Sequence, residues 1–357
     1  MIHDKRIGEF TCSASFRRWI AVKFIGYFMA TITNTLSTAP AESPIRPFDP
    51  RRDLEPVADL VELCFADTLD PDGREYIGRM RAAVNHPSFL SWAATAEWSH
   101  PALNGYIWHH QGRIVGNVSL IPYYIYSQRY YLIANVAVHP DFRRQGIARR
   151  LTEQAIQHAQ QRNSPSAWLH VREDNQAAVN LYNTLGFTER ARRTTWFSVP
   201  EFSQPSMLPG MRFTIPVGRT WSEQRSWLAQ DYPAELSWHM PFRMNLLRPG
   251  IVGEFYRFLY NATIHQWALV SSSRLLGAIA WQTTSGYANP LWLAIPPYSD
   301  ERLVHALLVH ARQHVPSTRP LMLDYPARQY AEAISKAGFS AHQTLMWMEL
   351  KLGKGSS

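Results

Sequence analysis

The stretch from Asn135 to Leu151 contains the residues whose types and spacing point most clearly to chemistry. It begins with apolar residues typical of a buried strand and then runs through a loop containing Gly146 into an amphipathic helix. Such a loop brings unpaired backbone N–H groups and the positive end of a helix dipole to one point, which suits a phosphate or pyrophosphate. Arg143, Arg144 and Arg149 add positive charge there. The sequence therefore predicts an anion-binding cradle between a strand and a helix.

The segments around this cradle predict a mixed α/β fold. Apolar alternation and turn residues predict strands at 45–48, 106–110, 114–126, 130–138, 167–171 and 194–199. Helical spacing predicts helices at 53–65, 76–84, 147–161 and 175–185, the last one ending at Gly186. Hairpins come first and a β-α-β crossover follows at the cradle. We therefore expect a central mixed, mostly antiparallel sheet flanked by helices.

The same order of elements returns in the second half of the chain. Its members are strands at 265–271, 275–283, 291–295, 320–323 and 347–350 and helices at 303–314 and 331–337. Gly338-Phe339 stands where Gly186-Phe187 stood, but the loop between Pro297 and Leu303 has no glycine and carries two acids. We expect no equivalent anion site in this second copy. The predicted domains are a leader or linker (1–44), a first domain (45–199), a linker (200–211), a degenerate second domain (212–352) and a tail (353–357).

Composition restricts the class of protein. A length of 357 residues suits two domains, and 46% hydrophobic residues permit two folded cores. The net charge of +8 is not gathered on a recognisable nucleic-acid-binding module, so we expect no nucleic-acid partner. Two cysteines, Cys12 and Cys64, cannot form a disulfide framework, which favours a reducing, cytoplasmic location.

The first forty or so residues differ from the rest. The apolar run from Trp19 to Thr33 is shorter than the ~20 residues that a membrane span needs. We expect a disordered or artefactual leader, with Met29 as an alternative start, and no stable membrane span. Metal binding is not expected either, because no His/Cys spacing suggests zinc and the neighbours His109 and His110 point to opposite faces of a strand.

A second motif follows the cradle at a characteristic spacing. Arg143-x-x-Gly146-x-Ala148 comes after Val136-Ala137-Val138, and Asn175-x-x-Ala178-x-x-x-Tyr182-x-x-x-Gly186-Phe187 comes downstream. Together they resemble the GCN5-related N-acetyltransferase (GNAT) superfamily, over about residues 45–199 well and 212–352 weakly. Residues 135–140 and 169–172 look most like its ribosomal-protein N-terminal acetyltransferase branch, and the tandem layout resembles two-domain members.

The resemblance implies acetyl-CoA as donor and a primary amine as acceptor. It places the pyrophosphate on the loop, where Gly146 lets the backbone approach without a Cβ. It also implies that the 136–138 strand separates from its neighbour, so that its backbone binds the pantetheine and polarises the thioester carbonyl. The residues so assigned to acetyl-CoA are Val136, Ala137, Val138, Arg143, Arg144, Gln145, Gly146, Ile147, Ala148, Arg149 and Asn175.

Two side chains are candidates for proton transfer. The resemblance implies that the Tyr182 phenol protonates or hydrogen-bonds the leaving thiolate, the alternative being a tyrosine that only packs in the core. The branch carries a catalytic Glu twelve residues before this tyrosine, where this chain has His170. With an ordinary pKa of about 6.5, a histidine there can accept a proton from the amine, unless it only lines the site. Glu173 and His139 are weaker candidates for this base.

The sequence thus predicts an N-acetyltransferase acting by direct attack in a ternary complex. A non-catalytic acyl-CoA sensor, transfer of a longer acyl group and an O-acceptor stay open as alternatives. The acceptor amine and the oligomeric state also stay open, and the second copy is expected to be a scaffold or to cover the acceptor side of the first. Aromatic residues that could form a wall for the acceptor are Trp92, Trp98 and the tyrosines Tyr123, Tyr124, Tyr126, Tyr130 and Tyr131.

Overall fold

The computed structural model describes residues 43–67, 69, 71–85, 104–199, 210–284, 286–316 and 318–353. Internal contacts divide the chain between Ser43 and Pro44, and nearly all described residues belong to the second of these units. The predicted leader and the tryptophans Trp92 and Trp98 lie outside the described residues. No helix in the described part of the chain is long and apolar enough to cross a membrane.

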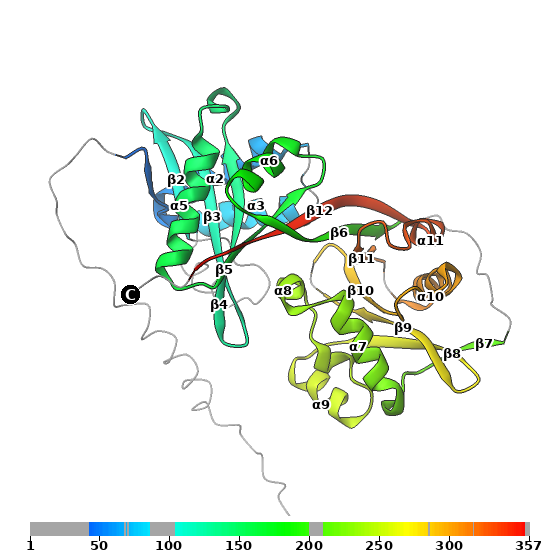
Figure 1. Cartoon of the computed structure of the whole chain (residues 1–357). Helices are drawn as coiled ribbons and strands as arrows, with labels where there is room; N and C mark the ends of the chain where they lie inside the picture. Colours follow the sequence, from blue (N-terminus) through cyan, green and yellow to red (C-terminus); the bar gives the residue numbers. More distant parts are fainter. Residues whose placement is uncertain are drawn as a thin grey trace, which may run out of the picture. The chain divides into compact units, whose positions relative to one another are not determined.

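The first half of the described chain has the predicted order of strands and helices (Figure 1). Its elements are β1 (Ile45–Pro47), α2 (Pro50–Phe65), α3 (Pro71–Asn85), β2 (Gly105–His110), β3 (Arg113–Ile125), β4 (Gln128–Val138), η1 (Pro140–Phe142), α5 (Ile147–Gln161), β5 (Ser166–Arg172), α6 (Gln176–Thr184) and β6 (Thr188–Ser198). The predicted start of α5 at Ile147 is confirmed, and Gly186 after α6 has a φ of 89°. The predicted mixed α/β fold is confirmed.

The second half repeats this order, with helices α7 to α9 between its first two strands where the first half has α2 and α3. The elements are β7 (Met211–Thr214), η2 (Gly218–Thr220), α7 (Trp221–Asp231), α8 (Ala234–Ser237), η3 (Met244–Leu247), α9 (Ile251–Leu259), β8 (Ile264–Ser271), β9 (Arg274–Gln282), β10 (Asn289–Ala294), α10 (Glu301–His314), β11 (Leu321–Pro326), α11 (Ala331–Lys336) and β12 (Phe339–Lys351). The sequence pattern assigned neither β7 nor α7, α8 and α9. The end of α7 and the α8 segment matter below because they contact residues of the first copy.

The described strands form one sheet that continues through both copies. Its order is β1-β2-β3-β4-β5-β12-β6-β11-β10-β9-β8-β7, so the closing strands of the two copies lie side by side at its centre. β6 and β12 pair antiparallel along nearly their whole length, from Phe339 opposite Ser198 to Glu349 opposite Thr188. The end of β12 pairs with β5, and the end of β6 pairs with β11. The last strand of each copy therefore lies within the other copy: β12 lies between β5 and β6, and β6 lies between β12 and β11.

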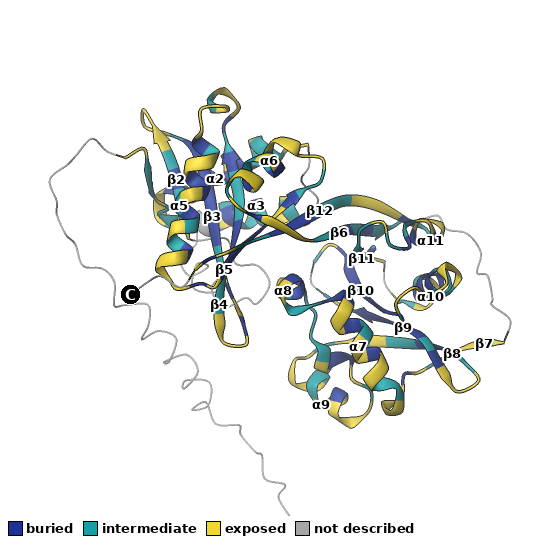
Figure 2. Ribbon diagram, viewed as in Figure 1, coloured by how far each residue is buried: buried dark blue, intermediate teal, exposed yellow. Residues whose placement is uncertain are grey.

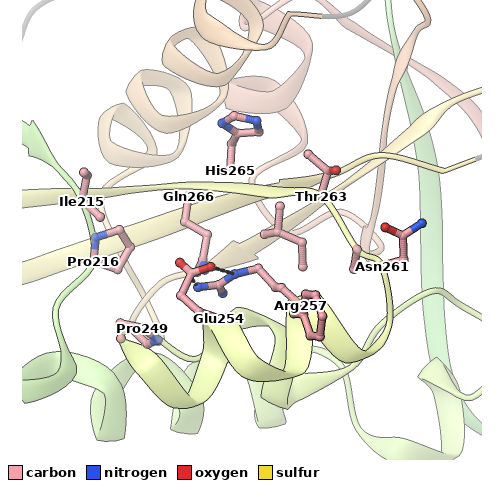
Figure 3. Close-up of a pocket in the computed structure, with 13 residues that line it drawn as sticks. Ile215, Pro216, Pro249, Glu254, Arg257, Asn261, Thr263, His265 and Gln266 are labelled. Carbon is pink, nitrogen blue, oxygen red and sulfur yellow. Dashed lines mark hydrogen bonds and ion pairs between the residues drawn. The ribbon is translucent and has the colours of Figure 1, made fainter. Parts of the chain in front are cut away.

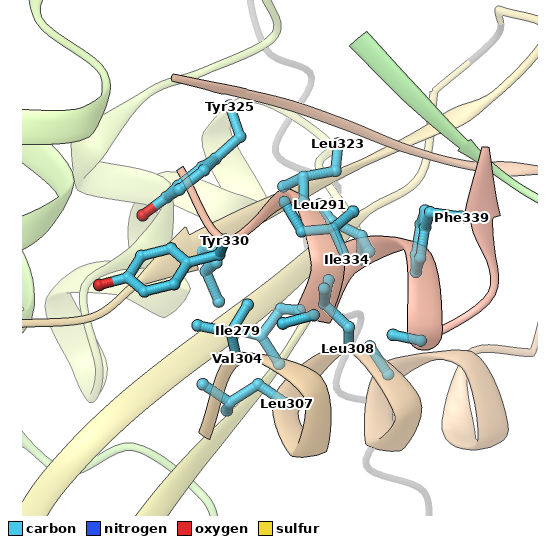
Figure 4. Packing of buried hydrophobic residues seen from close by; sticks show 14 of the residues in the cluster. Ile279, Leu291, Val304, Leu307, Leu308, Leu323, Tyr325, Tyr330, Ile334 and Phe339 are labelled. Carbon is cyan, nitrogen blue, oxygen red and sulfur yellow. The ribbon is translucent and has the colours of Figure 1, made fainter. Parts of the chain in front are cut away.

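Two buried clusters cover opposite faces of the first copy's strands. In Figure 2, buried residues follow the strands, and exposed residues lie on the outer sides of the helices. On one face, α5 and α6 pack over β3, β4 and β5, with Leu151, Leu169 and Val179 in the cluster. On the other face, α2 and α3 pack around Ile107 and Ala137. The second copy has a matching core in which α10 and α11 pack on β9, β10 and β11 (Figure 4).

A glycine in each copy lets the main helix lie directly on the sheet. A Cβ on Gly116 in β3 would lie 2.9 Å from Ile147 Cγ2 and 3.0 Å from Leu151 Cδ1. A Cβ on Gly277 in β9 would lie 2.9 Å from Leu307 Cδ1. Both glycines lie beside a register shift, opposite Trp108 and Leu269 respectively. The two copies thus share a detail of packing that sequence periodicity does not show.

We predict that Gly116→Ala and Gly277→Ala each destabilise the protein by about 1–3 kcal/mol, because the added methyl overpacks the contact between helix and sheet. Urea denaturation measures the change. Gly78→Ala is the control, since a Cβ added at Gly78 would meet no atom within 4 Å. In the interior of α3, this control should gain about 0.5–1 kcal/mol. Equal stabilities of Gly116→Ala and Gly78→Ala would contradict the packing argument.

Candidate functional site

The loop between β4 and α5 has the backbone geometry of an anion cradle. Arg144 and Gly146 have positive φ values of 66° and 78°, and Gly146 is the N-cap of α5 without a side-chain hydrogen bond to the helix end. The first helical bond here is from Arg150 N–H to the Gly146 carbonyl, at 3.1 Å. Within the described residues, no acceptor is recorded for the backbone N–H groups of 144–149. These donors and the helix dipole are available to an anion.

The cradle's arginines frame the loop. Arg143, Arg144 and Arg149 are all exposed. Arg143 donates from Nε to the Val138 carbonyl at 3.3 Å, and Arg149 donates to the Thr184 hydroxyl at 2.8 Å. The first contact ties the loop to the end of β4, and the second ties α5 to α6. The cradle is therefore held at a fixed place next to the end of β4.

β4 and β5 separate beside this cradle, as the resemblance implied. Their parallel pairing runs from Tyr131 opposite Ala167 to Ile133 opposite Leu169 and then stops. Beyond it, β4 pairs only with β3, across a register shift near Asn135, whose φ is 49°. The buried Asn117 side chain donates to the Asn135 carbonyl at 3.0 Å and holds this bulge. The strand edge at 136–138 that faces β5 therefore has no strand partner, and its Val138 carbonyl accepts from Arg143 and Cys64.

The same opening in the second copy is filled by the protein itself. β10 and β11 stop pairing at Leu291 opposite Leu323, and the next free N–H, that of Leu293, donates to the Tyr232 hydroxyl at 3.2 Å. The helix that follows is capped by Asp300, which accepts from the Arg302 N–H at 2.9 Å. A carboxylate at this helix end repels anions. These contacts support the expectation that the second copy has no equivalent cradle.

Tyr182 lies on α6, in the cluster that α5 and α6 form on the sheet. Its side chain is 7% exposed and meets the Phe187 ring edge-on at 6.0 Å between centroids. No hydrogen bond of its hydroxyl to a described residue is recorded. Burial raises the pKa of Tyr182 to about 12, so the phenol remains protonated at neutral pH. It can therefore donate a proton or a hydrogen bond.

His170 lies on the opposite face of the sheet. Leu169 and Val171 point into the cluster under α5 and α6, whereas Trp168 belongs to a cluster with Leu132 and Trp347 on the other face. Because side chains alternate along a strand, His170 shares the face of Trp168. It is also the first residue of β5 after the pairing with β4 ends. His170 and Tyr182 therefore lie on opposite sides of the opening.

The surroundings of His170 come largely from the second copy. Its ring stacks on Trp347 of β12 at 5.1 Å, and the His239 ring lies 5.1 Å from the same indole. Both histidines are accessible to solvent. Desolvation by the surrounding protein lowers the pKa of His170 to about 4. Desolvation lowers the pKa of His239 to about 3, with smaller contributions from His170 in its protonated form and from the Arg193 guanidinium. Both rings are neutral at pH 7.

This shift changes the argument for His170 as a base. A histidine of pKa about 4 is a poor acceptor from a free N-terminal ammonium, whose ordinary pKa is about 7.7–8.0. It is better suited to accept a proton from the amine nitrogen during attack, when that nitrogen becomes more acidic.

The weaker candidates are engaged elsewhere. The Glu173 carboxylate pairs with Arg192 at 3.1 Å and with Arg328 at 2.5 Å. The His139 ring lies between Arg113, at 2.8 Å from Nε2, and the Asp141 N–H, at 3.3 Å from Nδ1. His139 is therefore part of the turn before the cradle, and neither residue is free to act as the base.

Asn175 and the hairpin tyrosines have separate positions. Asn175 is the N-cap of α6, with its side-chain oxygen accepting from the Ala178 N–H at 3.1 Å. Its amide group can still reach a ligand. Tyr123 stacks on Trp238 and on Tyr130, whereas Tyr131 is buried under α5. Tyr124 and Tyr126 are exposed. The tyrosines therefore do not form one wall.

A buried charge network that the sequence did not predict fixes the end of α7 to β6 and β11. Arg193 of β6 is 3% exposed and forms an ion pair with Asp324. It also donates to the Asp231 carbonyl at 2.7 Å, and Tyr325 donates to the Asp231 carboxylate at 3.0 Å. Asp231 is the last residue of α7, shortly before His239. Only the fold brings these residues together, so no local signal could have revealed them.

The second copy also contains a cavity of about 560 Å³ between β8 and α9 (Figure 3). The ion pair of Glu254 and Arg257, at 2.7 Å, lies against it, and Gln266 lines it from β8. None of the predicted site residues lines this cavity. It is therefore separate from the cradle and from the opening between β4 and β5.

Comparisons with known proteins agree with this geometry. Residues 68–187 match the model of the acetyltransferase (GNAT) family. The ribosomal protein bS18-alanine N-acetyltransferase of Escherichia coli (strain K12) is 36% identical over 81 residues, which are 23% of this chain and 55% of that protein. The counterpart from Haemophilus ducreyi is 36% identical over 70 residues, 20% of this chain and 48% of that protein. The chain thus spans about half the length of the curated relatives it matches.

Solved structures resemble the whole two-copy layout at low sequence identity. A GCN5-related N-acetyltransferase from Sphaerobacter thermophilus has a TM-score of 0.55 and 16% identity, covering 88% of this chain and 97% of that one. A tandem GNAT protein from the clavulanic acid biosynthesis pathway has a TM-score of 0.50 and 14% identity, covering 88% and 99%. At these identities, the likeness shows the fold: two tandem GNAT folds.

We predict that the free energy of unfolding falls less on acidification in His170→Gln than in wild type. The folded-state pKa of His170, about 4, lies below the ordinary value of about 6.5. As the pH falls through this window, the unfolded chain binds a proton here that the folded chain does not, so stability is lost. Urea denaturation at neutral and mildly acidic pH should show a smaller loss in His170→Gln than in wild type. Tyr182→Phe removes no group that titrates in this range and should keep the wild-type slope. If the free energy of unfolding depended on pH equally in His170→Gln and wild type, the lowered pKa of His170 would be contradicted.

Proposed function

We propose that this chain, in which residues 68–187 belong to the acetyltransferase (GNAT) family, is an N-acetyltransferase whose active site lies in the first copy. The observation that carries the proposal is the uncapped cradle at 144–149 beside the opening of β4 from β5. The cradle offers donors for a pyrophosphate, and the opening offers backbone groups to an extended arm. Acetyl-CoA has both a pyrophosphate and an extended pantetheine arm. The proposal implies a location in the reducing cytoplasm.

The residues present fit acetyl-CoA. The N–H groups of 144–149 have no recorded acceptor among the described residues, and a Cβ added at Gly146 would meet no atom within 4 Å, so a ligand can approach the backbone there. The open edge at 136–138 provides hydrogen-bonding groups for the pantetheine amides. A backbone N–H at the same edge can stabilise the charge that develops on the thioester oxygen, because it is already oriented before reaction.

Tyr182 is proposed as the acid on the CoA side of the sheet. Its phenol is protonated at neutral pH because burial raises its pKa to about 12. A thiol with an ordinary pKa of about 8.5 is a stronger acid than this phenol. The phenol therefore stabilises the leaving thiolate mainly by donating a hydrogen bond, and complete proton transfer can follow through solvent.

His170 is proposed as the proton acceptor on the other side. It is neutral at pH 7, and its place at the start of the opening puts it beside an amine that attacks from the face of Trp168 and Trp347. Amine and thioester then meet from opposite sides of the sheet. Holding both reactants in this geometry can supply roughly 7–11 kcal/mol of the barrier reduction at best.

A peptide N-terminus is the first acceptor to test. The curated relatives are named for acetylating the alanine of a ribosomal protein, and the family model matches residues 68–187, which include the cradle. The rival function is a non-catalytic acyl-CoA sensor. A sensor would need the cradle but neither Tyr182 nor an accessible imidazole at the opening. Retention of Tyr182 favours the enzyme, whereas the absence of the branch's Glu at position 170 favours the sensor.

We expect wild-type protein to release free thiol from acetyl-CoA when an alanine-starting peptide or another primary amine is present. Tyr182→Phe should lower kcat by roughly 10²–10³-fold, the range for losing one hydrogen-bond donor to charge that develops in the transition state, and leave acetyl-CoA affinity nearly unchanged. His170→Gln should lower turnover of the amine with the same unchanged affinity. A wild-type protein that binds acetyl-CoA but acetylates no amine in the panel would favour the sensor instead.

We predict that Gly146→Ala weakens acetyl-CoA binding by about tenfold or more. An alanine at this φ of 78° is strained by about 1–2 kcal/mol, and its methyl would stand where the anion approaches the backbone. Isothermal titration calorimetry measures the affinity. Gly112→Ala is the matched control, because Gly112 has a φ of 81° and no atom within 4 Å of an added Cβ but lies in the turn between β2 and β3. Equal affinities of the two variants would contradict the cradle assignment.

A further inference from the structure

We infer that the second copy builds the acceptor side of the first copy's site, with His239 contacting the acceptor amine and the neighbouring Trp238 selecting an apolar carrier. This inference rests on the proposed function of the first copy. It assigns to the degenerate copy a direct part in recognition of the amine. It also names the acceptor class as a primary amine attached to an apolar or aromatic group.

The segment after α7 packs on the face of the sheet that carries His170. Leu236 of α8 lies in one buried cluster with Tyr123, Leu132 and Trp168 of the first copy. Trp238 stacks on Tyr123 with 4.1 Å between ring centroids and an angle of 8°. These contacts join residues far apart in sequence on the first copy's own strands. The segment 234–239 is therefore part of this face.

Trp347 connects the two histidines. It lies opposite His170 in the pairing of β12 with β5, and both imidazole rings lie 5.1 Å from its indole. The indole is 3% exposed, whereas both histidines are accessible. The accessible parts of this cluster are thus the two imidazoles. Each neutral imidazole has one nitrogen that can accept a hydrogen bond from an amine N–H.

The segment is fixed before any acceptor arrives. Arg193 donates to the Asp231 carbonyl at 2.7 Å and pairs with Asp324, while Tyr232 accepts from the Leu293 N–H at 3.2 Å. These bonds anchor the end of α7 a few residues before His239. A site held in place by such bonds avoids the entropic cost of ordering it on binding.

The nearby charges argue against an anionic carrier. Arg193 is committed to Asp324 and Asp231, and Arg190 pairs with Glu349 at 3.3 Å. An anionic carrier would therefore find no free counter-charge from either arginine. Trp238 is partly exposed and lies 5.5 Å from His239 between ring centroids, so it offers an apolar surface beside the amine. An ammonium is also attracted to an aromatic face.

The test compares His239→Gln with the matched variant His265→Gln. His265 is also an exposed histidine in contact with an indole, 5.1 Å from Trp281, but it lies in the second copy's own sheet. With phenethylamine as acceptor, His239→Gln should raise the KM for the amine by roughly 3–10-fold, as expected for one lost hydrogen bond. The KM for acetyl-CoA should not change, and His265→Gln should behave as wild type.

A second variant tests the carrier. Trp238→Leu should raise the KM for phenethylamine more than the KM for glucosamine, whose carrier is polar. Calorimetric titration of phenethylamine into the protein saturated with CoA gives a readout without turnover, and His239→Gln should bind it more weakly. Circular dichroism confirms that each variant is folded.

The outcomes separate the two proposals. Wild type that acetylates amines together with His239→Gln and Trp238→Leu of unchanged amine KM would overturn this inference and leave the proposed function intact. Wild type that acetylates no amine would overturn the proposed function. A preference for glucosamine over phenethylamine in wild type would overturn the acceptor class.

Discussion

Two parallel strands that separate in the middle of a sheet leave backbone N–H and C=O groups without partners, and buried polar groups of this kind are costly unless something satisfies them. β4 and β5 part after Ile133 and Leu169, and β10 and β11 part after Leu291 and Leu323. The two copies deal with these unpaired groups in different ways. One copy leaves the edge open next to an uncapped helix, and the other fills it with Tyr232.

In the second copy, the residues around the opening are also bound within the protein. Asp324 follows the last residue of β11 that pairs with β10, as His170 follows the last residue of β5 that pairs with β4. Where His170 is accessible, Asp324 is tied to the buried Arg193, and the helix that begins without a side-chain cap in the first copy begins with Asp300 in the second. The positions that would bind and react in one copy hold the chain together in the other.

The exchange of closing strands explains why the second copy is retained next to the first. β12 lies between β5 and β6, so Trp347 stands directly beside His170. Without β12, β5 would be an edge strand with free backbone groups, which invites non-native pairing. The segment carrying Trp238 and His239 covers the same face. The second copy thus supports the sheet and supplies the residues to which acceptor recognition is proposed to belong.

The sequence by itself determined the mixed α/β class, the repeat and the start of α5 at Ile147, because periodicity, turn residues and a glycine before a helix are local signals. It also indicated the cradle, since the donors of 144–149 come from one continuous stretch. The predicted domain limits and site residues stay predictions. The tertiary structure alone decided that β12 lies next to β5, that His239 approaches Trp347, and that desolvation lowers the pKa of His170 to about 4. Strand partners and desolvation depend on residues distant in the chain, and no local pattern carries that information.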